Sequence, residues 1–143
     1  MPILGFNFNK ITVERKTAAK GKVGVSNNIK LKGVEEAKLK SKDGKQSSIK
    51  VDFEFVSKYE PKLGEISLDG SLVYMGDAEK LKDAPKMFKK EKKLPPEIVA
   101  QVMNTVLARC HIQALMESQA VGLPSPIALP RVKSGEKEQR YIG

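Results

Sequence analysis

The chain has 143 residues, of which 40% are hydrophobic and 30% are charged, and its 26 Lys and Arg against 17 Asp and Glu give a formal net charge of +9. This composition predicts one globular domain with a buried core and excludes a chain too polar to fold. The single cysteine, Cys110, excludes an intramolecular disulfide framework and a cysteine-based zinc cluster.

The N-terminal stretch MPILGFNFNK lacks a basic region followed by an apolar one, so it does not predict a signal peptide. No run of 18 or more apolar residues occurs, so no membrane span is predicted. We therefore expect a cytoplasmic protein, which suits a chain with one cysteine.

The first half of the chain alternates between apolar and polar side chains, which predicts strands over residues 5–76. Asp43-Gly44 is a hairpin turn signal between two of them. The clearest alternation places Ile49, Val51, Phe53 and Phe55 on one face. The apolar positions of the last strand are Ile66, Leu68, Leu72 and Tyr74, with Gly70 where the strand can bend. Four strands with short connections predict an antiparallel meander sheet.

Residues 77–93 are rich in lysine and read as an irregular connector, with Pro85 in its middle. The basic balance favours an anionic partner, although a surface rich in Lys and Glu is also a habit of thermophile proteins. As a phosphate-contacting strip, the run would bind nucleic acid without sequence preference. The alternative is a solvated connector, since Phe88 is its one aromatic residue. The candidate anion-binding residues are Lys86, Lys89, Lys90, Lys92 and Lys93.

Residues 94–122 predict a helical region, either one long helix or two abutting helices, with Pro95-Pro96 at the start, Glu97 in the first turn and Gly122 as the stop. Its apolar stripe is wider than one face of a sheet requires, which indicates a second surface such as another subunit or a bound apolar ligand. The alternative is that the chain's own segment 121–132 covers the excess. That segment is apolar but holds Pro124, Pro126 and Pro130, so we expect it to be extended, followed by a flexible tail over 133–143.

We find no set of residues that predicts catalysis, a metal site or a cofactor. His111 is the only histidine, so no histidine pair can bind a metal. Cys110 and His111 are neighbours in a helical pattern and point about 100° apart, so they do not form a nucleophile–base pair. We expect a buried structural cysteine, and no enzyme.

The order of these motifs resembles the SecB family of export chaperones, in its divergent prokaryotic or archaeal branch. The resemblance covers residues 9–132. It is carried by Leu94-Pro95-Pro96 before the helix, by Gly122-Leu123-Pro124 with Leu129-Pro130 after it, and by the strand pair 49–76.

The resemblance implies an α+β fold, with a four-stranded antiparallel sheet covered by helices, and a homo-oligomer that is a dimer or a dimer of dimers. It also implies an ATP-independent holdase for protein transport, which binds unfolded polypeptides in apolar grooves without a cofactor. Methionines adapt to varied shapes, so they are among the candidate groove residues. These candidates are Met87, Phe88, Met103, Ile112, Met116, Leu123, Ile127 and Leu129.

The chain departs from the family in its charge. An acidic sheet surface recruits the SecA motor in that family, whereas Lys50, Asp52, Glu54, Glu65 and Asp69 make a mixed outward set here. This departure argues against SecA docking. Two other functions stay open on the sequence: a basic nucleic-acid-associated protein, and an assembly subunit with no client.

Overall fold

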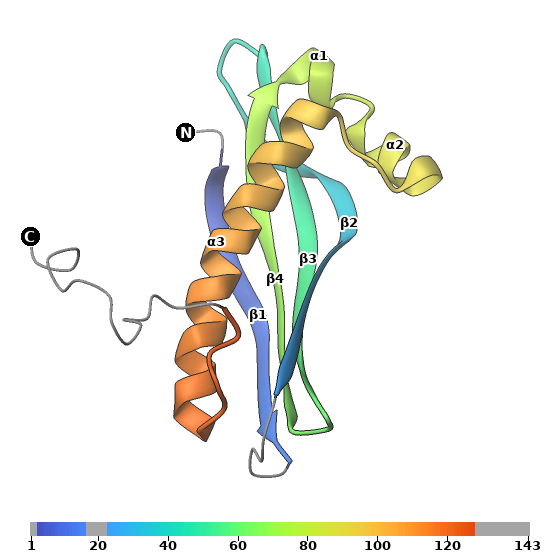
Figure 1. Ribbon diagram of the computed structural model, residues 1–143. Coiled ribbons are helices and arrows are strands. Elements are labelled where there is room, and N and C mark those ends of the chain that lie inside the picture. The colour runs from blue at the N-terminus through green and yellow to red at the C-terminus, as the bar shows by residue number, and fades with distance from the viewer. Residues whose placement is uncertain (1–2, 17–22, 128–143) are drawn as a thin grey trace, which may run out of the picture.

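The computed structural model describes residues 3–16 and 23–127 as four strands and three helices. The strands are β1 (Ile3–Arg15), β2 (Gly24–Lys40), β3 (Gln46–Glu60) and β4 (Gly64–Asp77), and the helices are α1 (Ala78–Leu81), α2 (Ala84–Glu91) and α3 (Pro96–Val121). The long helix α3 runs along one face of the sheet, and α2 lies beside β2 (Figure 1). The α+β architecture predicted from the sequence is therefore confirmed.

The sheet is antiparallel throughout, with the strand order β1-β4-β3-β2. The meander prediction holds for β2, β3 and β4. It is wrong for β1, which pairs with β4 across the register Val13 to Ile66 and does not pair with β2. β1 and β2, although consecutive in the sequence, therefore lie at opposite edges of the sheet.

The predicted turn at Asp43-Gly44 closes the β2–β3 hairpin. Gly44 has a φ of 73°, which favours glycine. The Asp43 carboxylate accepts from the Ser41 hydroxyl at 2.6 Å and from the Lys45 backbone N–H at 3.0 Å, and these bonds lower its pKa. Short-range polar contacts thus fix the turn.

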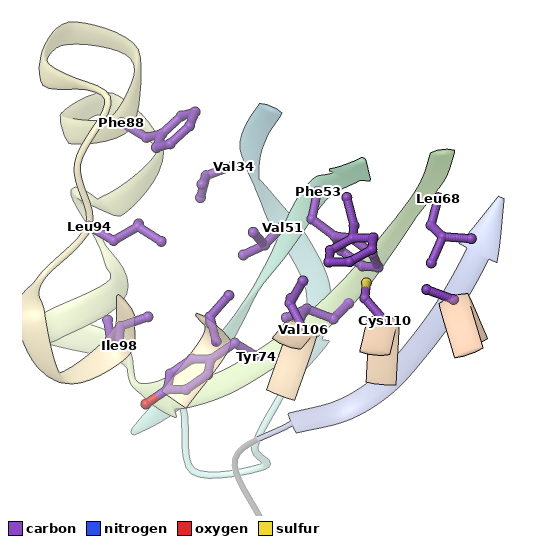
Figure 2. Close-up of a cluster of buried hydrophobic side chains, with 14 of the residues drawn as sticks. Val34, Val51, Phe53, Leu68, Tyr74, Phe88, Leu94, Ile98, Val106 and Cys110 are labelled. Carbon is purple, nitrogen blue, oxygen red and sulfur yellow. The ribbon is translucent and has the colours of Figure 1, made fainter. Parts of the chain in front are cut away.

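The core lies between the sheet and α3. The alternating apolar positions of β3 and β4 that the sequence indicated are buried, and they face the helix. From α3, side chains spaced four residues apart meet them in a row of Ile98, Val102, Val106, Cys110, Ala114 and Ser118. Figure 2 shows part of this cluster, with Phe88 of α2 and Val34 of β2 closing one end.

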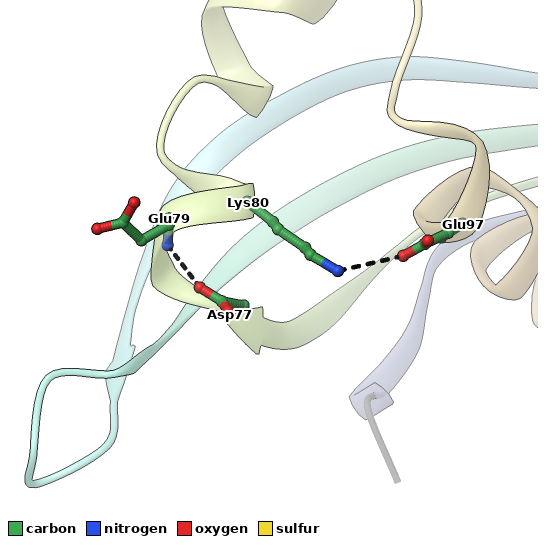
Figure 3. A network of polar contacts seen from close by, with 4 residues as sticks. All are labelled: Asp77, Glu79, Lys80 and Glu97. Atoms are coloured by element: carbon green, nitrogen blue, oxygen red, sulfur yellow. Dashed lines mark hydrogen bonds and ion pairs between the residues drawn. The ribbon is translucent and has the colours of Figure 1, made fainter.

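Residues 77–93 differ from the expected irregular connector because they form α1 and α2. Asp77 caps α1 by accepting from the Glu79 backbone N–H at 2.9 Å, and Lys80 reaches Glu97 of α3 at 3.5 Å (Figure 3). Pro85 lies in the first turn of α2, where its missing N–H breaks no helical bond. The buried side chains Leu81 and Phe88 give this lysine-rich stretch the apolar contacts that make it helical.

The predicted stop signal of the long helix is confirmed. Gly122 has a φ of 73°, and the N–H of Leu123 donates to the Ser118 carbonyl at 2.8 Å. This left-handed cap satisfies carbonyls at the end of α3 that lack a helical partner.

The chain after α3 turns back onto the sheet. Leu123 is buried, the Tyr59 hydroxyl donates to the Pro124 carbonyl at 2.6 Å, and the Asn27 side-chain amide donates to the Pro126 carbonyl at 2.9 Å. Both proline carbonyls therefore find donors on β2 and β3. Residues 128–132 of the predicted extended segment and the predicted tail lie outside the described residues.

Candidate functional site

A groove opens between α2, α3 and β2. It exists because α3 packs mainly over β1 and β4, whereas α2 packs against β2, so the helix-facing side of β2 is covered only in part. The groove has a volume of about 820 Å³ and is lined by Lys30, Leu31, Lys32, Phe88, Lys92, Val99 and Met103. We call it the α2–β2 groove.

The floor of the α2–β2 groove is apolar because of how the three elements place their side chains. Leu31 shares the helix-facing side of the sheet with its neighbour Phe53 on β3. Val99 and Met103 each follow a residue of the buried row, which turns them about 100° around the helix, toward β2. Phe88 reaches in from α2 and is buried.

The rim of the groove carries three lysines. Lys92 is the C-cap of α2 with a φ of 57°, and its ammonium lies 5.5 Å from the centre of the Phe88 ring. Lys32 forms ion pairs of 3.7 Å with Glu54 and with Asp69 on the outer side of the sheet. None of the lining residues within 3–16 and 23–127 is acidic.

A second apolar surface lies on the side of α3 that faces away from the sheet. Ile112 is 60% exposed and Met116 is 59% exposed, and small residues such as Ala108 and Ala120 share this side. We call Ile112 and Met116 the outer pair. Since each follows a buried-row residue by two positions, it points about 200° around the helix from the core.

The structure separates the candidate groove residues of the sequence analysis into different environments. Phe88 and Met103 line the α2–β2 groove together, while Met87 is exposed on α2 outside its lining. Leu123 packs into the core, and Ile127 is half-buried. The outer pair lies away from the groove, and Leu129 falls outside the described residues.

Sequence reasoning missed Leu31, Val99, Lys30 and Lys32 as groove residues. Alternation had placed Leu31 in a strand, but its role depends on β2 being an edge strand, which only the strand order shows. Of the five candidate anion-binding lysines, all are exposed on α2 or directly after it, and Lys92 alone lines the groove.

Cys110 and His111 both pack against other residues of the fold. Cys110 is fully buried, and burial raises the pKa of its thiol to about 12. The His111 ring meets the Phe55 ring edge-on at 5.6 Å between centroids. Within residues 3–16 and 23–127, no three potential metal-ligating side chains gather, and no helix has the length and apolarity to cross a bilayer.

Comparisons with known proteins give a match in structure. No family model matches the chain, and no curated protein sequence matches it. A solved structure does: the SecB-like chaperone Rv1957 of Mycobacterium tuberculosis, in complex with a ChAD peptide from the Rv1956 HigA1 antitoxin. The similarity has a TM-score of 0.61 and covers 92% of this chain and 88% of that chain, at 12% sequence identity.

The chain has a SecB-like fold. The similarity noted from the order of sequence motifs is therefore confirmed at the level of the fold. At 12% identity it shows the fold alone. A fold does not fix a function, so the function of this chain depends on its groove and its exposed surfaces.

Proposed function

We propose that this protein is an ATP-independent, SecB-like holdase that binds non-native polypeptide segments in the α2–β2 groove. The observation that carries the proposal is the groove itself: an open, apolar floor of Leu31, Phe88, Val99 and Met103. The peptide bound to the Mycobacterium tuberculosis chaperone supports polypeptide as the kind of ligand.

The groove suits unfolded chains because apolar contacts are non-directional and do not require a ligand of one defined shape. Burying one leucine-sized side chain in an apolar site contributes about 2 kcal/mol. Met103 has a flexible thioether that adapts to side chains of different form. Weak apolar contacts of this kind hold a segment without requiring a defined sequence, and their release needs no nucleotide.

The proposal includes a homo-oligomer, either a dimer or a tetramer. Its basis is the outer pair, Ile112 and Met116, together with the small side chains beside them. A second copy of α3 can pack closely on such a surface, and this would remove exposed apolar area from water. We place the protein in the cytoplasm, with neither a cofactor nor an enzymatic activity.

The decisive experiment is suppression of aggregation. A chemically unfolded model protein is diluted into buffer without ATP, and its light scattering is followed with a several-fold excess of this protein. We expect suppression by the wild type. Absence of any effect would contradict the proposed function.

A variant pair tests whether the groove is responsible. Met103→Glu places a charge on the floor and should weaken client binding roughly tenfold, since it removes most of the apolar contribution of that side chain. Gln101→Glu adds the same charge at an exposed position of α3 and should suppress aggregation as the wild type does. Equal activity of both variants would move the client site away from the groove.

Two other functions remain distinguishable by experiment. Binding of generic RNA that is lost on addition of salt would favour a nucleic-acid-associated protein with Lys86, Lys89, Lys90, Lys92 and Lys93 as its contacts. A stable oligomer whose mass does not change with a denatured substrate would favour an assembly subunit with no client.

A further inference from the structure

The described charged side chains at the rim of the α2–β2 groove are all positive, and the floor between them is apolar. Lys30 and Lys32 flank Leu31 on the edge strand β2, so their side chains start from the outer face of the sheet at one border of the groove, while Lys92 stands at the other border, at the end of α2. Among the described residues, the lining includes no carboxylate. A client that fills the floor therefore places its neighbouring residues beside ammonium groups.

Two of these charges are available to a ligand. Among the residues that the structure describes, no carboxylate lies within 4.0 Å of the ammonium groups of Lys30 or Lys92. Lys32 differs, because Glu54 and Asp69 already offset its charge from the outer side of the sheet. Lys30 lies opposite Glu54 in the β2–β3 register but forms no ion pair with it, so the rim charges without an ion pair are Lys92, which has no acidic residue beside it in the described lining, and Lys30.

The position of Lys92 is fixed by the end of α2. Its backbone N–H donates to the Phe88 carbonyl at 2.8 Å, and its ammonium lies over the Phe88 ring. The same residue pair therefore supplies one apolar side chain of the floor and one positive charge of the rim. This arrangement fits a ligand in which an apolar side chain and a carboxylate are close in sequence.

We propose that the α2–β2 groove selects apolar polypeptide segments flanked by acidic residues, with Lys30 and Lys92 as the specificity-determining residues. This inference rests on the proposed function and names the class of client that the function takes. Exposed ion pairs contribute modestly and are screened by salt, so two of them give a preference of about 3- to 10-fold.

The test uses two fluorescent peptides that share one apolar core and carry either glutamates or lysines at its flanks. Fluorescence anisotropy with the full chain should show tighter binding of the acidic peptide by about 3- to 10-fold at low salt, and a smaller difference at high salt because exposed charges are screened. Equal binding of both peptides would overturn the inference while the proposed function stands. Failure of both peptides to bind would overturn the inference and contradict the proposed groove function with it.

A matched pair of double variants assigns the preference to the groove. Lys30→Gln with Lys92→Gln should abolish it. Lys58→Gln with Lys62→Gln should keep the preference, because these exposed lysines lie outside the groove. They match the first pair in backbone conformation. Lys58, like Lys30, is on a strand, and Lys62 has a φ of 47° against 57° for Lys92. An equal loss in both double variants would assign the preference to overall charge and overturn the inference.

A third ligand separates peptide selection from general polyanion binding. A single-stranded oligonucleotide carries negative charge without an aliphatic segment for the floor. We expect it to bind more weakly than the acidic peptide. Binding as tight as that of the acidic peptide, lost in the Lys30→Gln and Lys92→Gln variant, would overturn the inference in favour of a nucleic-acid site.

Discussion

At Gly70 the lack of a side chain lets three strands come together. A Cβ atom at this position would collide with the Asn7 carbonyl oxygen of β1 and with the Phe53 ring of β3. The sequence indicated a bend here, and the pairing of β1 with β4 is irregular between Phe8 and Lys10, opposite Gly70 and Asp69. The contact with Phe53 could not be predicted, because it depends on the register between β3 and β4.

Gly70→Ala should therefore destabilise the protein. Forcing a methyl group against a backbone oxygen and a buried ring costs about 1–3 kcal/mol of unfolding free energy. Gly5→Ala is the matched control, because a Cβ at this strand glycine would meet nothing within 4 Å. Urea unfolding measures both, and equal stability of the two variants would refute the crowding argument.

Among the elements, α3 was the easiest to predict. Prolines at its start and Gly122 after its end mark its limits in the sequence, and the structure shows one continuous helix between them, where the sequence had left one helix or two abutting helices open. α1 and α2 were missed because lysine and proline dominate their composition, while only Leu81, Ala84 and Phe88 are buried. The excess apolar width of α3 was also visible, and the segment up to Ile127 does not cover it, since Ile112 and Met116 stay exposed.

If the outer pair forms the contact between copies, Ile112→Glu with Met116→Glu should lower the mass of the particle in solution. Carboxylates buried at such a contact would lose their hydration without a partner. Gln101→Glu with Gln119→Glu adds the same charge at exposed polar positions of α3 and should keep the wild-type mass. Multi-angle light scattering decides, and an unchanged mass for the first variant would show that the copies meet elsewhere.

At the scale of the whole molecule, the groove depends on three elements that are distant in sequence. Phe88 and Met103 were among the candidate groove residues, whereas Leu31 was visible only as an apolar strand position, because the edge position of β2 follows from the placement of β1 beside β4. The outer face of the sheet carries positive and negative side chains that form ion pairs, including Lys50 with Asp52 at 4.0 Å. The sequence argument against SecA docking stays a prediction, and this mixed face is consistent with it.

The stability of the whole domain should fall at alkaline pH. Burial raises the pKa of the Cys110 thiol from 9.0, and that of the Tyr59 hydroxyl from 10.0, to about 12. Well below pH 9 both groups are protonated in the folded and the unfolded chain. Between pH 9 and about 12 the unfolded chain releases these protons first, so the unfolding free energy decreases by at most about 1.4 kcal/mol per pH unit for each group.

Chemical unfolding at a series of pH values tests this expectation. Cys110→Ala lacks the thiol, so its unfolding free energy should decline less steeply than that of the wild type between pH 9 and 10. The Tyr59 hydroxyl begins to contribute above pH 10 in both proteins. Identical slopes between pH 9 and 10 would show that the thiol ionises equally in the folded and the unfolded chain.

Contacts at both of its ends hold α3 in place on the sheet. Its first turn is held by buried Leu94 and by the contact of Glu97 with Lys80, and its last turn continues into Leu123 and Pro124, which are anchored on the sheet. In the proposed function, a client segment would therefore gain room less readily by moving α3 than by moving α2, a helix of only about two turns, or the thioether of Met103.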